Sequence, residues 1–187
     1  MKRYQEPMSQ DPTVRIRPAT AADVAAMIPI VNAAFSVETF LDGTRTDEER
    51  MTGMMDEGEF LLAERAPGRV VACVYTELRG KRGYFGMLAV GPPEQGAGLG
   101  RRMVDAAEDY CRERGCDFMD ITVLNLRPEL APFYRKLGYI ETGTEEFHPS
   151  RPLKDGVVCH CIVMSKALQD PRCESRDENH HRGDGKK

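Results

Sequence analysis

The stretch from Tyr84 to Arg101 reads YFGMLAVGPPEQGAGLGR and joins an apolar segment to a glycine-rich turn. Aromatic and aliphatic side chains dominate residues 84–90, which is typical of a strand. The strand must end at Gly91-Pro92-Pro93, because proline donates no hydrogen bond to a sheet ladder. The sequence therefore predicts a strand that leads directly into a glycine-rich turn.

This turn has the composition of an anion-binding loop. Gly96, Gly98 and Gly100 carry no Cβ, so a ligand can approach the main chain closely. From Leu99 onward the apolar residues recur at helical spacing, and Gly115 marks the predicted end of that helix. The free amides of its first turn would point into the loop, where the helix dipole favours phosphate.

Several classes of phosphate-binding loop are distinguished by their spacing. A nucleoside-triphosphatase loop ends in Gly-Lys-Ser/Thr, whereas this one closes as Gly100-Arg101-Arg102, so that class is excluded. A dinucleotide-binding oxidoreductase requires a glycine at Arg101, although Asp117 and Asp120 lie at a tolerable distance for the ribose. A surface turn without any ligand is a further alternative.

The spacing Gln95-x-x-Gly98-x-Gly100 resembles the Gln/Arg-x-x-Gly-x-Gly/Ala signature of the GNAT superfamily of acyl-CoA-dependent N-acyltransferases. That signature follows a strand with a Leu-x-Val-like end, here Leu88-Ala89-Val90. The segment 125–139, NLRPELAPFYRKLGY, is similar to a second element of the family, which ends in Phe/Leu-Tyr-x-x-x-Gly-Phe/Tyr. Two motifs in the family's order support the resemblance more strongly than either alone.

Length and composition are consistent with one α/β (α+β) domain. We predict that this domain spans residues 13–169, between polar tails at 1–12 and 170–187 that are expected to be mobile. The resemblance implies a GNAT-like fold, with a mixed, mostly antiparallel central sheet flanked by helices. The pattern predicts strands at 14–17, 59–65, 69–78, 84–90, 118–125, 139–146 and 157–165, with helices capped by Thr20 and Thr46, a third from Leu99, and a short fourth ending at Gly138.

By resemblance, the main chain of the strand end would pair with the pantetheine arm of acetyl-CoA, and Val90 N–H would point at the thioester carbonyl. Amides from Gln95 through Arg101 would hold the pyrophosphate. Asn125 is nine residues before Tyr134, which departs from the family's usual asparagine spacing. The implied acetyl-CoA-binding residues are Leu88, Ala89, Val90, Gln95, Gly96, Ala97, Gly98, Leu99, Gly100, Arg101 and Asn125.

Tyr134 is the predicted catalytic residue. A phenol has an ordinary pKa near 10, similar to that of an alkyl thiol, so it suits proton donation to a departing CoA thiolate. Its position matches the general-acid tyrosine of the family, although a packing role alone is the alternative. Glu38 and His148 lie in segments where the family builds its acceptor site, and either is a candidate base or a plain surface residue.

These features predict an N-acetyltransferase that transfers an acetyl group from acetyl-CoA to a small-molecule or peptide amine. A non-catalytic acyl-CoA sensor on the same fold is the main alternative, and a nicotinamide-dependent oxidoreductase is another. The acceptor itself does not follow from any motif. The last strands could pair at an exposed edge, so a homodimer is possible.

Composition argues against other partners. The net charge of −4, with scattered basic residues, disfavours a nucleic-acid partner. No apolar run approaches the roughly 20 residues of a membrane span, and no apolar segment follows the basic N-terminal residues, so we expect no membrane association and a cytoplasmic protein. The six cysteines include no Cys-x-x-Cys pair, so they are expected to be core residues and not metal ligands.

Overall fold

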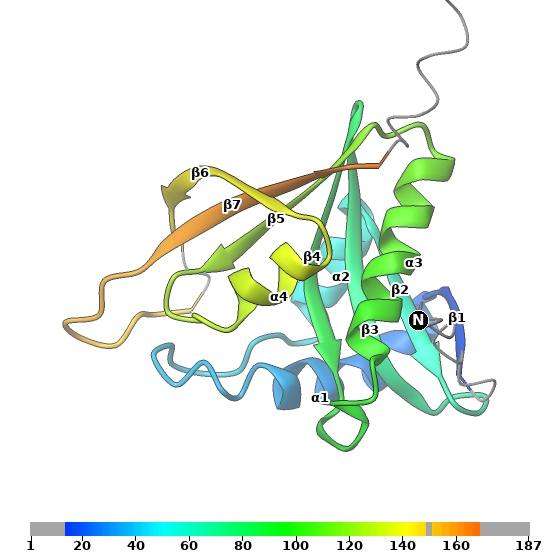
Figure 1. The fold of residues 1–187 in the computed structure, drawn as a ribbon. Helices are drawn as coiled ribbons and strands as arrows, with labels where there is room; N and C mark the ends of the chain where they lie inside the picture. The colour runs from blue at the N-terminus through cyan, green and yellow to red at the C-terminus, as the bar shows by residue number, and fades with distance from the viewer. Residues whose placement is uncertain (1–13, 149–150, 169–187) are drawn as a thin grey trace, which may run out of the picture.

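Seven strands form one sheet in the order β1-β2-β3-β4-β5-β7-β6 in the computed structural model, which describes residues 14–148 and 151–168 (Figure 1). All neighbouring strands are antiparallel except β4 and β5, which run parallel. The strands are β1 (Arg15–Pro18), β2 (Glu59–Glu64), β3 (Val70–Arg79), β4 (Arg82–Val90), β5 (Phe118–Leu124), β6 (Ile140–Glu146) and β7 (His160–Ala167). The predicted fold class is confirmed, with strand ends shifted by a few residues.

Helices cover both faces of this sheet. They are α1 (Val24–Ala34), α2 (Glu48–Glu57), α3 (Leu99–Glu113) and α4 (Leu130–Lys136), with short 3-10 helices η1 (Ala21–Asp23) and η2 (Pro92–Glu94). Thr20 and Asp23 form the predicted capping box. The prediction that Thr46 caps α2 is wrong by one residue, because the Asp47 side chain accepts a hydrogen bond from Arg50 N at 2.9 Å.

The core has two parts, because alternate residues of a strand point to opposite faces. Leu61 and Ala63 of β2 belong to the cluster that includes α3 and α4, whereas Phe60 and Leu62 belong to the cluster beneath α1 and α2. Four cysteines, at 73, 111, 116 and 161, are buried and unbridged, as expected of small core residues, whereas Cys159 is only partly buried and departs from that expectation. Cys173 and both predicted tails lie outside the described residues.

Strands β4 and β5 diverge soon after they meet. Their parallel register covers three residue pairs, from Arg82–Phe118 to Tyr84–Asp120, and then stops. Beyond this point β5 continues only with β7. The divergence opens the middle of the sheet and positions the site described below.

A β-bulge interrupts β4 beside this opening. Tyr75 pairs with Gly86 and Cys73 with Ala89, so Val74 opposes both Met87 and Leu88. Met87 has φ of 50°, which is unusual for a residue that is not glycine. The main-chain irregularity of β4 therefore lies at Met87–Leu88, whereas Val90, whose N–H the resemblance directs at the thioester carbonyl, pairs with Ala72 of β3.

Within residues 14–148 and 151–168, no helix is long and apolar enough to cross a membrane. The same residues contain no group of three or more histidine, cysteine, aspartate or glutamate side chains placed to hold a metal ion.

Candidate active site

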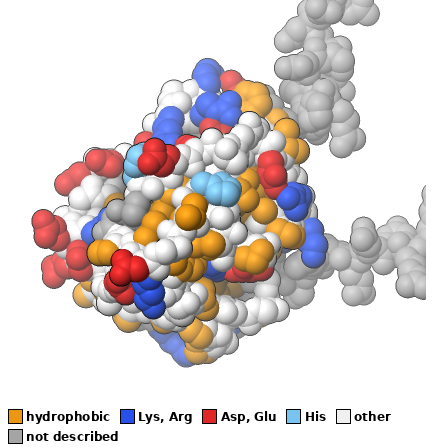
Figure 2. Space-filling view, turned by 90° about the vertical axis from the view of Figure 1, so that its left-hand side faces the viewer, with side chains coloured by type: hydrophobic (Ala, Val, Ile, Leu, Met, Phe, Trp, Pro, Cys, Tyr) orange, Lys and Arg blue, Asp and Glu red, His pale blue; other side chains and the backbone are white. Residues whose placement is uncertain are grey.

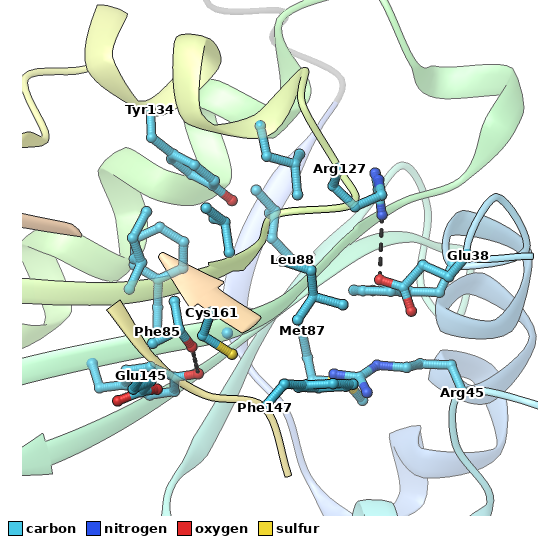
Figure 3. A pocket seen from close by; sticks show the side chains of 18 of the residues that line it. Glu38, Arg45, Phe85, Met87, Leu88, Arg127, Tyr134, Glu145, Phe147 and Cys161 are labelled. Atoms are coloured by element: carbon cyan, nitrogen blue, oxygen red, sulfur yellow. Dashed lines mark hydrogen bonds and ion pairs between the residues drawn. The ribbon is translucent and has the colours of Figure 1, made fainter. Parts of the chain in front are cut away.

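A cavity of about 590 Å³ lies where β4 and β5 diverge. Its walls include the bulge residues Met87 and Leu88, the facing residues Val123 and Leu124 of β5, and Tyr134 of α4 (Figure 3). The loops after α1 and before β7 lie at the left of Figure 1. Seen from that side, hydrophobic side chains gather in the middle of the surface and acidic side chains lie along one edge (Figure 2).

The glycine-rich loop lies beyond the C-terminal end of β4. Gly96 and Gly98 have φ of 82° and 80°, a conformation that side-chain-bearing residues seldom adopt. Gln95 Nε2 donates to the Val90 carbonyl at 3.0 Å and so ties the loop to the strand. The predicted helix begins at Leu99, confirming the expected start, and Gly98 is its N-cap.

The loop has the free space that a phosphate group needs. A Cβ added at Gly100 would have only Val90 Cγ2 nearby, at 3.8 Å, and one added at Gly96 would meet nothing within 4 Å. The first backbone amide to bond inside α3 is that of Arg102, which donates to Gly98 O at 3.2 Å. The amides of residues 99–101 are therefore the unpaired donors of the helix start. These features fit a pyrophosphate group held by main-chain amides.

Tyr134 packs in an aromatic cluster at the cavity wall. Its ring centroid lies 5.8 Å from those of Phe85 and Tyr139, and 5.0 Å from that of Phe133. The residue is 6% exposed, and its hydroxyl makes no hydrogen bond with the described residues. In Figure 3 that hydroxyl points into the cavity. Burial raises the pKa of Tyr134 above the ordinary value of a phenol, while the Arg127 charge opposes this shift.

Glu38 lines the cavity but is held in an ion bridge. Its Oε2 accepts from Arg151 Nη2 at 2.5 Å, and its Oε1 accepts from Arg127 Nη1 at 3.3 Å. The residue is 6% exposed. Because both carboxylate oxygens are occupied by guanidinium groups, Glu38 joins two loops and is not placed as a free base for the acceptor.

The other two predicted residues have different positions. His148 is exposed and lines the cavity, so it stays a candidate for the acceptor side. Asn125 is absent from the cavity walls, and its Oδ1 accepts from His160 N at 2.9 Å. The asparagine thereby joins the end of β5 to the start of β7, and its predicted contact with acetyl-CoA stays a prediction.

Sequence reasoning missed several cavity residues. Arg45 and Arg50 come from the loop after α1 and from α2, while Glu145 and Phe147 come from β6 and the loop after it. None of these residues belongs to a sequence motif, because the two parts of the chain that carry them are far apart in the sequence and become neighbours only in the folded protein. The one available signal was their location in segments where the family varies its acceptor site.

Comparison with known proteins is consistent with this geometry. The sequence model of the Acetyltransferase (GNAT) family matches residues 25–139, and the chain therefore belongs to the GNAT family of acetyltransferases. The chain is 29% identical over 141 residues to glucosamine 6-phosphate N-acetyltransferase 1 of Oryza sativa, covering 70% of this chain and 84% of the relative. It is 26% identical to mycothiol acetyltransferase of Propionibacterium freudenreichii, covering 71% of this chain but only 45% of that protein.

Solved structures share the fold at low sequence identity. The ribosomal-protein-S18-alanine N-acetyltransferase of Escherichia coli matches with a TM-score of 0.67 and 18% identity, covering 84% of this chain and 95% of that one. A phosphinothricin acetyltransferase of Sinorhizobium meliloti, solved in complex with acetyl-CoA, matches with a TM-score of 0.65 and 19% identity, covering 83% and 89%. At this identity the matches support the fold, and the acceptor must be inferred from the site.

Proposed function

We propose that this acetyltransferase moves the acetyl group of acetyl-CoA to an amine by direct attack, with Tyr134 as the general acid. The observation that carries the proposal is the juxtaposition at one cavity of a β4 bulge and a tyrosine whose hydroxyl makes no hydrogen bond with the residues that the structure describes. The family's named members are consistent with this activity, since a glucosamine 6-phosphate and a mycothiol acetyltransferase are among the relatives.

The glycine-rich loop would hold the pyrophosphate of acetyl-CoA through the amides of residues 99–101. The edge of β4 from Leu88 to Val90 that β5 leaves uncovered would pair with the pantetheine arm, apart from the Val90 carbonyl, which accepts from Gln95 Nε2. The main chain at the bulge, Met87–Leu88, would stabilise the negative charge that develops on the thioester oxygen. Bound acetyl-CoA supplies the acyl group, and these residues orient it.

Tyr134 holds the proton needed by the leaving group. The acceptor attacks as the neutral amine, after its ammonium form has lost a proton to solvent. As the N–C bond forms and the C–S bond breaks, the electron pair of the C–S bond stays on the sulfur. Tyr134 then donates its hydroxyl proton to that thiolate. The proton that the new amide nitrogen sheds passes through solvent to restore the Tyr134 hydroxyl after it has protonated the sulfur. The raised pKa makes the phenol of Tyr134 a weaker acid than it is in water. Burial in the same cavity raises the proton affinity of the CoA thiolate as well, so the proton transfer remains favourable.

Release of free CoA thiol tests the reaction directly. The purified chain is incubated with acetyl-CoA and a panel of amines that includes amino sugars, amino acids, polyamines and short peptides. Acceptor-dependent thiol release supports the proposal. Tight acetyl-CoA binding without release from any acceptor would instead favour the sensor alternative.

Gly100→Ala tests the loop separately from the chemistry. The added methyl group has room beside Val90 and extends a helix, so we expect unfolding stability to stay equal or rise by up to about 1 kcal/mol. The same methyl group occupies the surface that faces the pyrophosphate, so acetyl-CoA affinity should fall roughly tenfold, or about 1.4 kcal/mol. Calorimetric titration and urea unfolding measure the two effects.

Gly53→Ala is the matched control, because Gly53 lies exposed in α2 with nothing within 4 Å of an added Cβ. It should gain helix stability and leave acetyl-CoA affinity unchanged. Equal affinities in Gly100→Ala and the wild type would show that the pyrophosphate does not approach this loop.

A further inference from the structure

One end of the cavity carries more positive than negative charge. Arg127 and Arg151 are both paired with Glu38, and Arg127 Nε also donates to Glu129 at 2.6 Å. Arg45 and Arg50 line the same cavity, and neither forms an ion pair with the described residues. Among residues 14–148 and 151–168, two guanidinium groups at this end, those of Arg45 and Arg50, therefore have no carboxylate partner.

Arg45 is the more enclosed of the two. Its guanidinium carbon lies 4.9 Å from the centroid of the Phe35 ring, which supports the charge on one side. Its Nε is buried and has no hydrogen-bond partner among the described residues. Burial lowers the pKa of Arg45, with Glu38 opposing this and the neighbouring arginines adding to it. A buried charge in this state is costly unless a ligand completes its hydrogen bonds.

Arg45 lies on the acceptor side of the cavity. In Figure 3 its side chain extends beneath Met87 toward Phe147, across the cavity from Tyr134. None of the residues of the glycine-rich loop lines this cavity. An anion that bonds to the Arg45 guanidinium group would therefore occupy a different site from the pyrophosphate proposed for that loop.

The opposite end of the cavity is acidic. Glu145 of β6 lines the wall away from Arg45 in Figure 3 and is exposed to solvent. The cavity thus has a cationic end at Arg45, an acidic end at Glu145, and the bulge residues between them. A volume of about 590 Å³, part of which must hold the thioester end of acetyl-CoA, leaves space for a small molecule.

We propose that the acceptor is a small amine that also carries an anionic group, a phosphate or a carboxylate, and that Arg45 binds this group. Arg50 adds positive charge on the same side, and the ammonium end faces the bulge and Glu145. This inference rests on the proposed function for its reaction and names the substrate class of that site.

Three amines of matched skeleton test the charge requirement: O-phosphoethanolamine, β-alanine and ethanolamine. Their binding is measured by calorimetry with and without saturating CoA, which blocks the glycine-rich loop, and their acetylation by thiol release. We expect the two anionic amines to bind and react at least roughly tenfold better than ethanolamine. The preferred one of the pair identifies phosphate or carboxylate as the anion.

Arg45→Met keeps the length of the side chain and its contact with Phe35 but removes the charge. Binding of the preferred anionic amine should weaken roughly 10- to 100-fold, and Arg45→Lys should restore part of it. Arg69→Met is the matched control, because Arg69 is exposed in the turn between β2 and β3, away from the cavity. It should bind all three amines as the wild type does.

The outcomes separate this proposal from the general one. Equal acetylation of all three amines would overturn the anionic acceptor while supporting the acetyltransferase mechanism. Arg45-dependent binding without acetylation of any amine would support the anion site and count against that mechanism. The anion site at Arg45 would be overturned if binding of the anionic amines did not change in Arg45→Met, or if that binding disappeared when CoA was added.

Discussion

Tyr134→Phe is expected to lower kcat by roughly 10²- to 10⁴-fold, because it removes only the proton that the leaving thiolate must receive. The ring stays in its aromatic cluster, so the KM for acetyl-CoA and the folding stability should be nearly unchanged. Steady-state thiol release at saturating acceptor measures kcat. An unchanged kcat would show that Tyr134 is a packing residue and that water protonates the thiolate.

Tyr110→Phe is the control for this substitution. Tyr110 is half-buried, and burial raises its pKa to about 12, but its hydroxyl donates to Glu59 at 2.5 Å and Tyr110 does not line the cavity. Its replacement should leave kcat unchanged. The pH profile gives a second readout, because a protonated phenol is required and burial raises the pKa of Tyr134. We therefore expect no alkaline loss of kcat below about pH 10 that could be assigned to this group.

Glu38→Ala is expected to lower the free energy of unfolding by about 3–5 kcal/mol. The substitution leaves the buried Arg151 and the partly buried Arg127 guanidinium groups beside each other without the carboxylate that joins them. Urea unfolding followed by circular dichroism measures the loss. Because those arginines come from the loop after β5 and the loop before β7, the damage should reach both sides of the acceptor cavity.

Glu129→Ala provides the comparison for Glu38. Glu129 also pairs with Arg127, at 2.6 Å, but its side chain is 58% exposed. An exposed pair of this kind contributes about 0–1 kcal/mol, so its loss should be small. If Glu38→Ala and Glu129→Ala were equally mild, the Glu38 bridge would not be what holds the two loops together.

The strands, the helix start and the glycine-rich loop could be predicted because each depends on local sequence. Leu99 begins α3 directly after the glycine that caps it, and Gly115 follows the helix with φ of 82°. Such features need only residues that are neighbours in the chain. The position of the bulge could not be predicted, because Met87 and Leu88 look like any other strand residues until β3 is aligned with them.

The acceptor side was less predictable because it is made from distant segments. Leu41 forms an isolated bridge with Leu153, and the main chain around it pairs Asp42 N with Pro152 O at 3.0 Å. This contact brings the loop that holds Glu38 and Arg45 against the segment of Arg151. No sequence pattern predicts a contact between residues more than a hundred positions apart. The partners of these charged side chains could therefore be identified only from the folded structure.

The brief pairing of β4 with β5 also affects how the molecule meets its neighbours in solution. Exposed strand edges invite other chains to add to a sheet and aggregate. Here the edge of β4 that β5 leaves uncovered faces inward, across the cavity from β5, while the outer edge strand β6 carries Glu146 and Glu141, and Glu141 pairs with Arg135. The sheet therefore offers an open edge to a slender ligand that can enter lengthwise, while the charged side chains of its outer strand disfavour addition of a strand from another protein.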